Sequence, residues 1–334
     1  ALVIQLRRSY LVAEIRRRGQ YVGNLMRDRV SDTLASLLLL AIMAAPLALV
    51  MTTVGWLLQS AYEVSGFARS VGHALLVAAP FFYTLRVLQL FVRPGGVAEV
   101  HFGWSEQGAV RLRHGLAWFV PLAVITGLLT VLAFQTSTQS WGSGLARALW
   151  VLMNLQFALF FYQLTHPRHG VLVALLNEHR GNIAYRLRHV WFVFLSLAPI
   201  VAAGIAMAGY IYTSRIIIEH IDNTLWLILL LVIVYQVVAR WMLLNERRLR
   251  LEALLAKRKA EREAREAQVE DGDAEGIALR EFEEPEVDIR ALDAASRRLI
   301  TNVALLTGII GCGFIWQDML PALRIFDDIT LWSY

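Results

Sequence analysis

The sequence predicts an all-α polytopic membrane protein with about seven transmembrane helices, arranged as repeated helical hairpins that cytoplasmic interfacial helices introduce. Three observations support this fold class. First, 57% of the 334 residues are hydrophobic and only 18% are charged, whereas soluble domains carry about 45–50% apolar and about 25% charged residues. Second, the apolar residues form runs of about 20, the length that crosses a bilayer. Third, the basic residues concentrate in alternate connections between these runs.

Seven apolar runs are long enough to span the hydrocarbon core, and their interiors contain no Asp or Glu. They cover about residues 33–59, 67–92, 115–135, 146–165, 189–212, 223–243 and 299–317. Four runs contain an interior proline, which membrane helices tolerate because neighbouring groups satisfy the freed carbonyl. We interpret these prolines as candidate helix bends that shape packing, at Pro46, Pro80, Pro121 and Pro199.

The distribution of basic residues predicts the orientation of the chain. Of the 32 Lys and Arg residues, 27 lie on one side of the membrane, in residues 1–32, 93–114, 166–188 and 240–298, and four lie on the other. Basic loops remain in the cytoplasm, so the N-terminus of this chain is expected in the cytoplasm and the C-terminus outside. An odd number of spans also requires the two ends to lie on opposite sides of the membrane, which agrees with this orientation.

The spans and loops together define five segments. They are a basic, amphipathic cytoplasmic segment (1–32), a six-helix transmembrane paddle (33–243) with hairpins at 33–92, 115–165 and 189–243, a charged cytoplasmic helix with an acidic linker (244–295), a seventh transmembrane helix (296–318) and an outer segment (319–334). The first residue is Ala and no signal peptide follows it, so we expect the chain to be a piece of a longer protein.

An Arg-x-Arg pair precedes the first, third and fifth runs, and this repeat predicts two-helix units that pack side by side. The pairs are Arg27 and Arg29, Arg111 and Arg113, and Arg186 and Arg188. Arginine and tryptophan near a membrane surface suit anionic lipid headgroups, although positive-inside loops produce such clusters without a specific lipid site. The candidate lipid or interface anchors are Arg111, Arg113, Arg186, Arg188, Trp104, Trp191, Arg240 and Trp241.

The sequence contains no catalytic or nucleotide-binding motif, so we expect neither an enzyme nor a cofactor. No metal site is expected either, because the histidines of the 166–189 region have only Glu178 nearby. The net charge of +5 is attributed to topology rather than to nucleic acid. Uncharged polar residues within the spans, such as Asn154, Gln156 and Gln163, are expected to form hydrogen bonds between helices.

Several segments, in this order, resemble the transmembrane part of the large bacterial mechanosensitive channels of the MscK/MscM type, in the MscS superfamily. They are Val92-Arg93-Pro94-Gly95-Gly96 with His101-Phe102-Gly103-Trp104, Arg240-Trp241-Met242-Leu243 with Arg247-Arg248, Glu286-Val287-Asp288-Ile289 with Ser296-Arg297-Arg298-Leu299, and Trp316 to Pro321 with Ile329-Thr330-Leu331-Trp332. The resemblance implies the bacterial inner membrane, an assembly of seven subunits and about eleven membrane helices, of which the last lines the pore. Residues 1–6 would then end the first helix, and the seven runs would be the second to eighth helices.

The resulting hypothesis is a lipid-embedded tension sensor whose pore lies outside these residues. A polytopic transporter is one alternative, although the spans contain no acidic residue that could couple transport to ions. A membrane enzyme acting on lipid-linked substrates would need a denser cluster of interfacial acids or histidines. A non-conducting membrane scaffold is the third alternative, and the sequence leaves it open.

Overall fold

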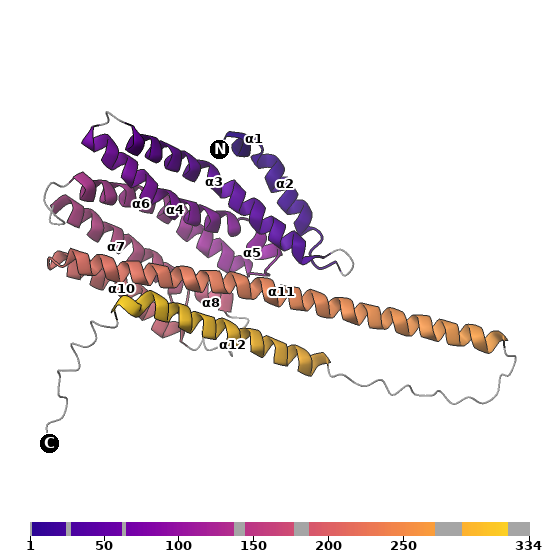
Figure 1. Ribbon diagram of the computed structural model, residues 1–334. Coiled ribbons are helices and arrows are strands. Elements are labelled where there is room, and N and C mark those ends of the chain that lie inside the picture. The colour runs from indigo at the N-terminus through magenta and orange to yellow at the C-terminus, as the bar shows by residue number, and fades with distance from the viewer. Residues whose placement is uncertain are drawn as a thin grey trace, which may run out of the picture. The chain divides into compact units, whose positions relative to one another are not determined.

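The computed structural model describes residues 2–24, 28–61, 65–136, 144–176, 187–270 and 289–319, and these residues form helices and turns without any strand (Figure 1). Within these ranges, seven helices are long and apolar enough to cross a membrane, which confirms the predicted fold class. They are α3 (Val30–Ser60), α4 (Gly66–Phe91), α6 (Glu106–Thr136), α7 (Gly144–Thr165), α10 (Arg188–Met207), α11 (Ile211–Glu270) and α12 (Ile289–Trp316).

Short helices precede the hairpins, as the repeat predicts. Helices α1 (Leu2–Leu6) and α2 (Arg8–Gly19) precede the first hairpin, α5 (Val97–Val100) the second, and α8 (Val171–Leu176) the third. The second connection differs from expectation, because α6 begins at Glu106 and not at residue 115. Arg111 and Arg113 therefore lie within the membrane helix itself, and Glu106 in the first turn favours this early start.

The chain divides into two compact units, and each is described by itself. One unit comprises Ala1–Val22 and Ser31–Asp222, and the other comprises Gly23–Val30 and Asn223–Tyr334. Of the predicted features, Arg186, the acidic linker at 271–288 and the segment at 320–334 lie outside the described residues.

In the first unit, α3 and α4 cross closely at two glycines. A Cβ atom on Gly55 would lie 2.8 Å from the carbonyl oxygen of Gly72, and a Cβ atom on Gly72 would lie 2.8 Å from the carbonyl oxygen of Gly55. Small residues let membrane helices approach at backbone distance in this way. The hydroxyl of Tyr83 also donates to the carbonyl oxygen of Ala41 at 3.3 Å.

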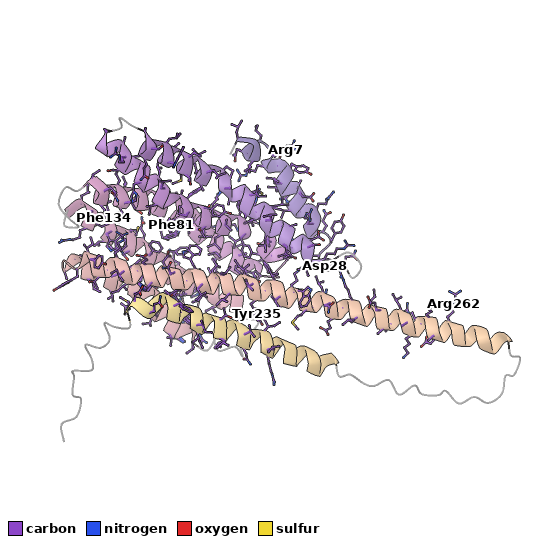
Figure 2. All side chains as sticks on the ribbon, in the orientation of Figure 1. Arg7, Asp28, Phe81, Phe134, Tyr235 and Arg262 are labelled. Carbon is purple, nitrogen blue, oxygen red and sulfur yellow. The ribbon has the colours of Figure 1, made fainter. Side chains whose placement is uncertain are left out.

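The helices of the first unit follow one another side by side in chain order, with α4 against α6, α6 against α7, and α7 against α10 (Figure 1). Aromatic contacts fill these interfaces. The rings of Phe119 on α6 and Phe160 on α7 stack with centroids 4.2 Å apart. The ring centroid of Phe81 on α4, which Figure 2 labels, lies 6.3 Å from the ring centroid of Phe157 on α7. Direct packing between consecutive hairpins is what the repeat predicted.

The turn of the third hairpin is shorter than the sequence suggested. The predicted span at 189–212 and connection at 213–222 are incorrect, because α10 ends at Met207 and α11 starts at Ile211. Gly209 ends the helix with a φ of +106°, a conformation that glycine adopts at no steric cost. The apolar residues on both sides of this turn had hidden it.

Helix α11 continues past the apolar run, which ends at residue 243, as a charged helix that reaches Glu270. Arg262 lies on this charged continuation (Figure 2). In the second unit α12 packs on α11 through small residues, since Cβ atoms on Gly308 and Gly311 would lie 3.2 Å and 2.7 Å from the side chains of Leu231 and Leu227. Trp316 Nε1 donates to Thr224 Oγ1 at 3.0 Å at the end of this contact.

Candidate functional site

The two arginines of the second Arg-x-Arg pair serve different contacts. Arg113 Nη2 lies 3.3 Å from Glu99 Oε1, and Glu99 Oε2 accepts a hydrogen bond of 2.8 Å from the backbone nitrogen of Gly95. Gly95 has a φ of +62°, the left-handed conformation that glycine favours. Arg113 therefore ties the start of α6 to the turn that leads from α4 into α5.

Arg111 faces the turn that follows α7. Its Nη1 donates to the carbonyl oxygens of His169 at 3.0 Å and Gly170 at 3.5 Å. The turn is tight, because Gly170 N donates to the His166 carbonyl oxygen at 2.7 Å and a Cβ on Gly170 would lie 2.5 Å from that oxygen. His166 Nδ1 accepts from the backbone nitrogens of Arg168 and His169, both at 3.2 Å.

A groove of about 540 Å³ opens beside Arg111, between α6, α7 and this turn. Its polar and aromatic lining consists of Arg111, His114, Trp118, Tyr162, Gln163, His166 and His169, and its apolar lining includes Leu112, Gly115 and Phe160. The indole Nε1 of Trp118 donates to Gln163 Oε1 at 3.1 Å across the groove wall. No carboxylate belongs to the lining among the described residues, so the groove is positively charged.

The third connection contributes aromatic residues next to this groove. Phe192 of α10 lies 5.5 Å from Tyr162 and 5.7 Å from His166, measured between ring centroids. Arg188 and Trp191 are half-buried in the first turn of α10. Arg186 lies outside the described residues, so Arg188 on α10 is the member of the third Arg-x-Arg pair that the structure describes.

The remaining anchor candidates have different surroundings. Trp104 is half-buried and packs edge-on against Phe91, with ring centroids 5.3 Å apart. Trp241 is 55% exposed and can face lipid or headgroups. Arg240 Nη2, in contrast, lies 2.8 Å from Asp28 Oδ1, and the two side chains are only 11% and 6% exposed. The guanidinium of Arg240 is thus held within the protein.

Each of the four prolines lies inside a helix that continues past it. Pro199 is buried, Pro46 is half-buried, and Pro80 and Pro121 are exposed on their helices. Their role as bends stays a prediction. Thr84 Oγ1 donates to the carbonyl oxygen of Pro80 at 2.7 Å, so a hydroxyl one turn further along binds the backbone at this position.

Polar side chains join the helices within the apolar runs. Thr126 Oγ1 donates to Gln156 Oε1 at 2.8 Å between α6 and α7, so Gln156 and Gln163 form the expected bonds between helices. Asn154 Nδ2 instead donates to the Trp150 carbonyl oxygen of its own helix at 2.9 Å. The expectation of a hydrogen bond between helices is therefore wrong for this side-chain nitrogen.

Sequence reasoning missed two buried polar contacts. Trp150 Nε1 donates to Ser214 Oγ at 2.8 Å, and Ser214 Oγ donates to the Ala202 carbonyl oxygen at 2.7 Å. Thr33 Oγ1 and His101 Nδ1 lie 3.2 Å apart, with both residues buried. Ser214 lies between the predicted runs at 189–212 and 223–243, and no spacing in the sequence links Thr33 to His101.

Comparison with known proteins agrees with this architecture. The family model described as "Mechanosensitive ion channel inner membrane domain 1" matches residues 1–332. The chain is 26% identical over 338 residues to the miniconductance mechanosensitive channel MscM of Escherichia coli (strain K12), covering 98% of this chain and 29% of MscM. It is 25% identical over 336 residues to the mechanosensitive channel MscK of the same organism, covering 99% of this chain and 28% of MscK.

An uncharacterized MscS family protein of Haemophilus influenzae is 25% identical over 244 residues, which cover 72% of this chain and 21% of that protein. No solved structure matches the chain significantly. The chain thus spans less than a third of the length of these curated relatives. Because the family model matches nearly every residue, the chain belongs to the mechanosensitive ion channel inner membrane domain family.

Proposed function

We propose that this chain is the tension-sensing transmembrane paddle of a bacterial mechanosensitive ion channel, which opens under membrane stretch such as that of hypoosmotic shock. Family membership carries the proposal, because the matching family and two relatives are described as mechanosensitive channels. The chain corresponds to less than a third of those relatives. The proposal therefore places the conducting pore outside these residues and assigns them the role of sensing the bilayer.

The packing of the hairpins supports a sensing role. Tension favours whichever state of a membrane protein occupies the larger area, and only a difference between states in lipid contact or area can shift their equilibrium. Each hairpin of the first unit contacts the next directly. A change in tilt that follows bilayer thinning in one hairpin would therefore be passed on to its neighbour.

The surface of the helices supports the same role. Large apolar side chains are exposed within the spans, among them Leu38 at 63%, Trp56 at 62% and Phe194 at 50%. Exposed surface of this kind suits contact with lipid tails. The candidate anchors that are exposed, such as Arg111 and Trp241, would hold the ends of their helices at the headgroups, so that thickness changes alter helix tilt.

The proposal includes the placement of the chain. The positive-inside distribution of Lys and Arg supports a multi-pass protein of the bacterial inner membrane, with the N-terminus of this chain in the cytoplasm and its C-terminus in the periplasm. The family resemblance supports a homo-oligomer of seven subunits. Membrane lipids are the expected partners, and no nucleic acid is expected.

Patch-clamp recording of the full-length protein in liposomes tests the proposal. We expect currents that open with suction and a threshold that rises when Arg111, Arg113, Arg186 and Arg188 are all replaced by Gln. A matched control replaces Arg247, Arg248, Lys257 and Arg258 by Gln, because these basic residues lie on the charged continuation of α11 and are exposed. An unchanged threshold with normal expression contradicts the anchoring role. The absence of any stretch-activated current would contradict the channel function and would favour a transporter or a non-conducting scaffold instead.

The mass of the native assembly provides a second test. We expect the subunit to be much heavier than 37.7 kDa and the complex in nanodiscs to have the mass of seven subunits. A monomer of 37.7 kDa would be an isolated membrane scaffold and would contradict the channel function.

A further inference from the structure

The positively charged groove beside Arg111 has the construction of a ligand site. Arg111, Gly115 and Trp118 occupy positions i, i+4 and i+7 of α6, so they line one face of the helix. This face runs from a cation to an aromatic ring over roughly 10 Å, at 1.5 Å per residue. The groove therefore joins a charged end to an apolar wall within a membrane helix pair.

We propose that this groove binds one anionic phospholipid, with its phosphate at Arg111 and its glycerol and upper acyl chain along Gly115, Trp118 and Phe160. The inference rests on the membrane setting that the proposed function gives these helices, and it does not depend on gating by tension. It goes beyond a general role of basic residues at the membrane surface, because it assigns one lipid to one groove.

The guanidinium of Arg111 has donors left for a phosphate. Its Nη1 binds the two carbonyl oxygens of the turn at His169 and Gly170. A guanidinium carries five N–H donors in a fixed fork, and the described residues provide no acceptor for the others. The two carbonyl contacts hold the side chain in place, so a phosphate meets an oriented donor rather than a mobile one.

The charge of the lining selects an anionic headgroup. Arg111 and the imidazoles of His114, His166 and His169 surround the groove, and no carboxylate lines it among the described residues. A headgroup whose only charge is its phosphate is complementary to these four side chains. The ammonium of a zwitterionic headgroup would enter the same groove without an acid to pair with. Basic grooves between membrane helices favour anionic lipids for this reason.

The neighbouring Arg113 provides an internal control, because it belongs to the same Arg-x-Arg pair but does not line the groove. Its guanidinium is 3.3 Å from Glu99, which neutralises it.

Gly115 provides a second probe. A Cβ atom there would lie 3.4 Å from Phe160 Cε2, an ordinary contact, so a larger side chain fits the helix and fills the groove.

The experiment measures lipid retained by the full-length protein. The wild type, R111Q, R113Q and G115L are placed in nanodiscs of phosphatidylcholine with and without phosphatidylglycerol, extracted into mild detergent, and examined by native mass spectrometry. We expect the wild type and R113Q to retain phosphatidylglycerol in preference to phosphatidylcholine. R111Q should retain about tenfold less, the effect of losing one charge-assisted interaction of about 1.4 kcal/mol. G115L should lose the bound lipid although its charge is unchanged.

Several results would overturn the proposal. They are equal retention by the wild type, R111Q and G115L, equal retention of the two lipids, and an equal loss in R113Q and R111Q. Displacement of phosphatidylglycerol by inorganic phosphate would identify a free-anion site and would also overturn it. Thermal melting of each variant separates loss of lipid from loss of fold, and G115L decides the matter if R111Q unfolds. A negative result in this experiment would not contradict the channel function, which the patch-clamp recording tests separately.

Discussion

Asp28 and Arg240 lie 212 positions apart in the sequence and form an ion pair of 2.8 Å that is almost fully enclosed. The second carboxylate oxygen of Asp28 accepts a hydrogen bond of 2.8 Å from the backbone nitrogen of Gly23. The pair thus fixes the segment before α3 to the middle of α11 within the second unit.

Breaking this pair is expected to destabilise the protein. R240Q leaves the Asp28 carboxylate enclosed without its cation, a loss of about 3–5 kcal/mol for a buried pair. The midpoint of thermal unfolding in detergent should fall in R240Q and in D28N, and the double variant should lose less than the sum of the two. R247Q, on the exposed side of the same helix, should melt like the wild type. Additive losses would show that the two residues do not act as a pair.

The crossing of α3 and α4 predicts a strong dependence on glycine. G55A places a methyl group 2.8 Å from the Gly72 carbonyl oxygen, so the helices must separate, at about 1–3 kcal/mol. G127A on α6 is the control, since no atom lies within 4 Å of a Cβ there. It should be neutral or stabilising by up to about 1 kcal/mol. Thermal melting measures both, and equal stability of the two variants would contradict the close crossing.

The contact between Trp150 and Ser214 predicts the effect of removing one hydroxyl. S214A leaves the indole N–H of Trp150 and the carbonyl oxygen of Ala202 without the partner they have at 2.8 Å and 2.7 Å. The expected loss is about 1–3 kcal/mol for a buried polar group left unsatisfied. T213A, at the exposed neighbouring position, should change stability little. A shift in the tryptophan fluorescence of S214A alone would support the assignment.

The predicted orientation can be checked by labelling with a membrane-impermeant maleimide. The single Cys312 is first replaced by Ser, and one cysteine is then introduced at Arg17 or at His169 for the cytoplasmic side, and at Ser65 or at Thr136 for the outer side. In intact cells we expect labelling of the Ser65 and Thr136 variants only, because positive-inside loops stay in the cytoplasm. The reverse pattern would invert the topology.

Much of the fold followed from the sequence because the bilayer restricts the possible solutions. Every backbone polar group within hydrocarbon must be paired inside its own segment, so an apolar run of sufficient length becomes a helix. The seven runs were found for this reason, and the Arg-x-Arg pairs before alternate runs indicated how the runs group into hairpins. Element boundaries were less certain, as at Gly209 and at Glu106, because apolar or amphipathic residues continue on both sides of a turn or a helix start.

The sequence by itself determined that this chain is a helical membrane protein of repeated hairpins, and the basic residues of alternate connections predict its orientation. Composition and run length are sufficient for this prediction because the free energy of transferring a side chain from water into hydrocarbon is roughly a sum over individual residues. The tertiary structure alone decided which polar groups meet. Arg111 and Arg113 read alike, yet one faces a turn and a groove and the other an acid. Arg240 was expected at the headgroups and is enclosed with Asp28. Contacts of this kind depend on how helices rotate and pack against their neighbours, and periodicity along one chain does not contain that information.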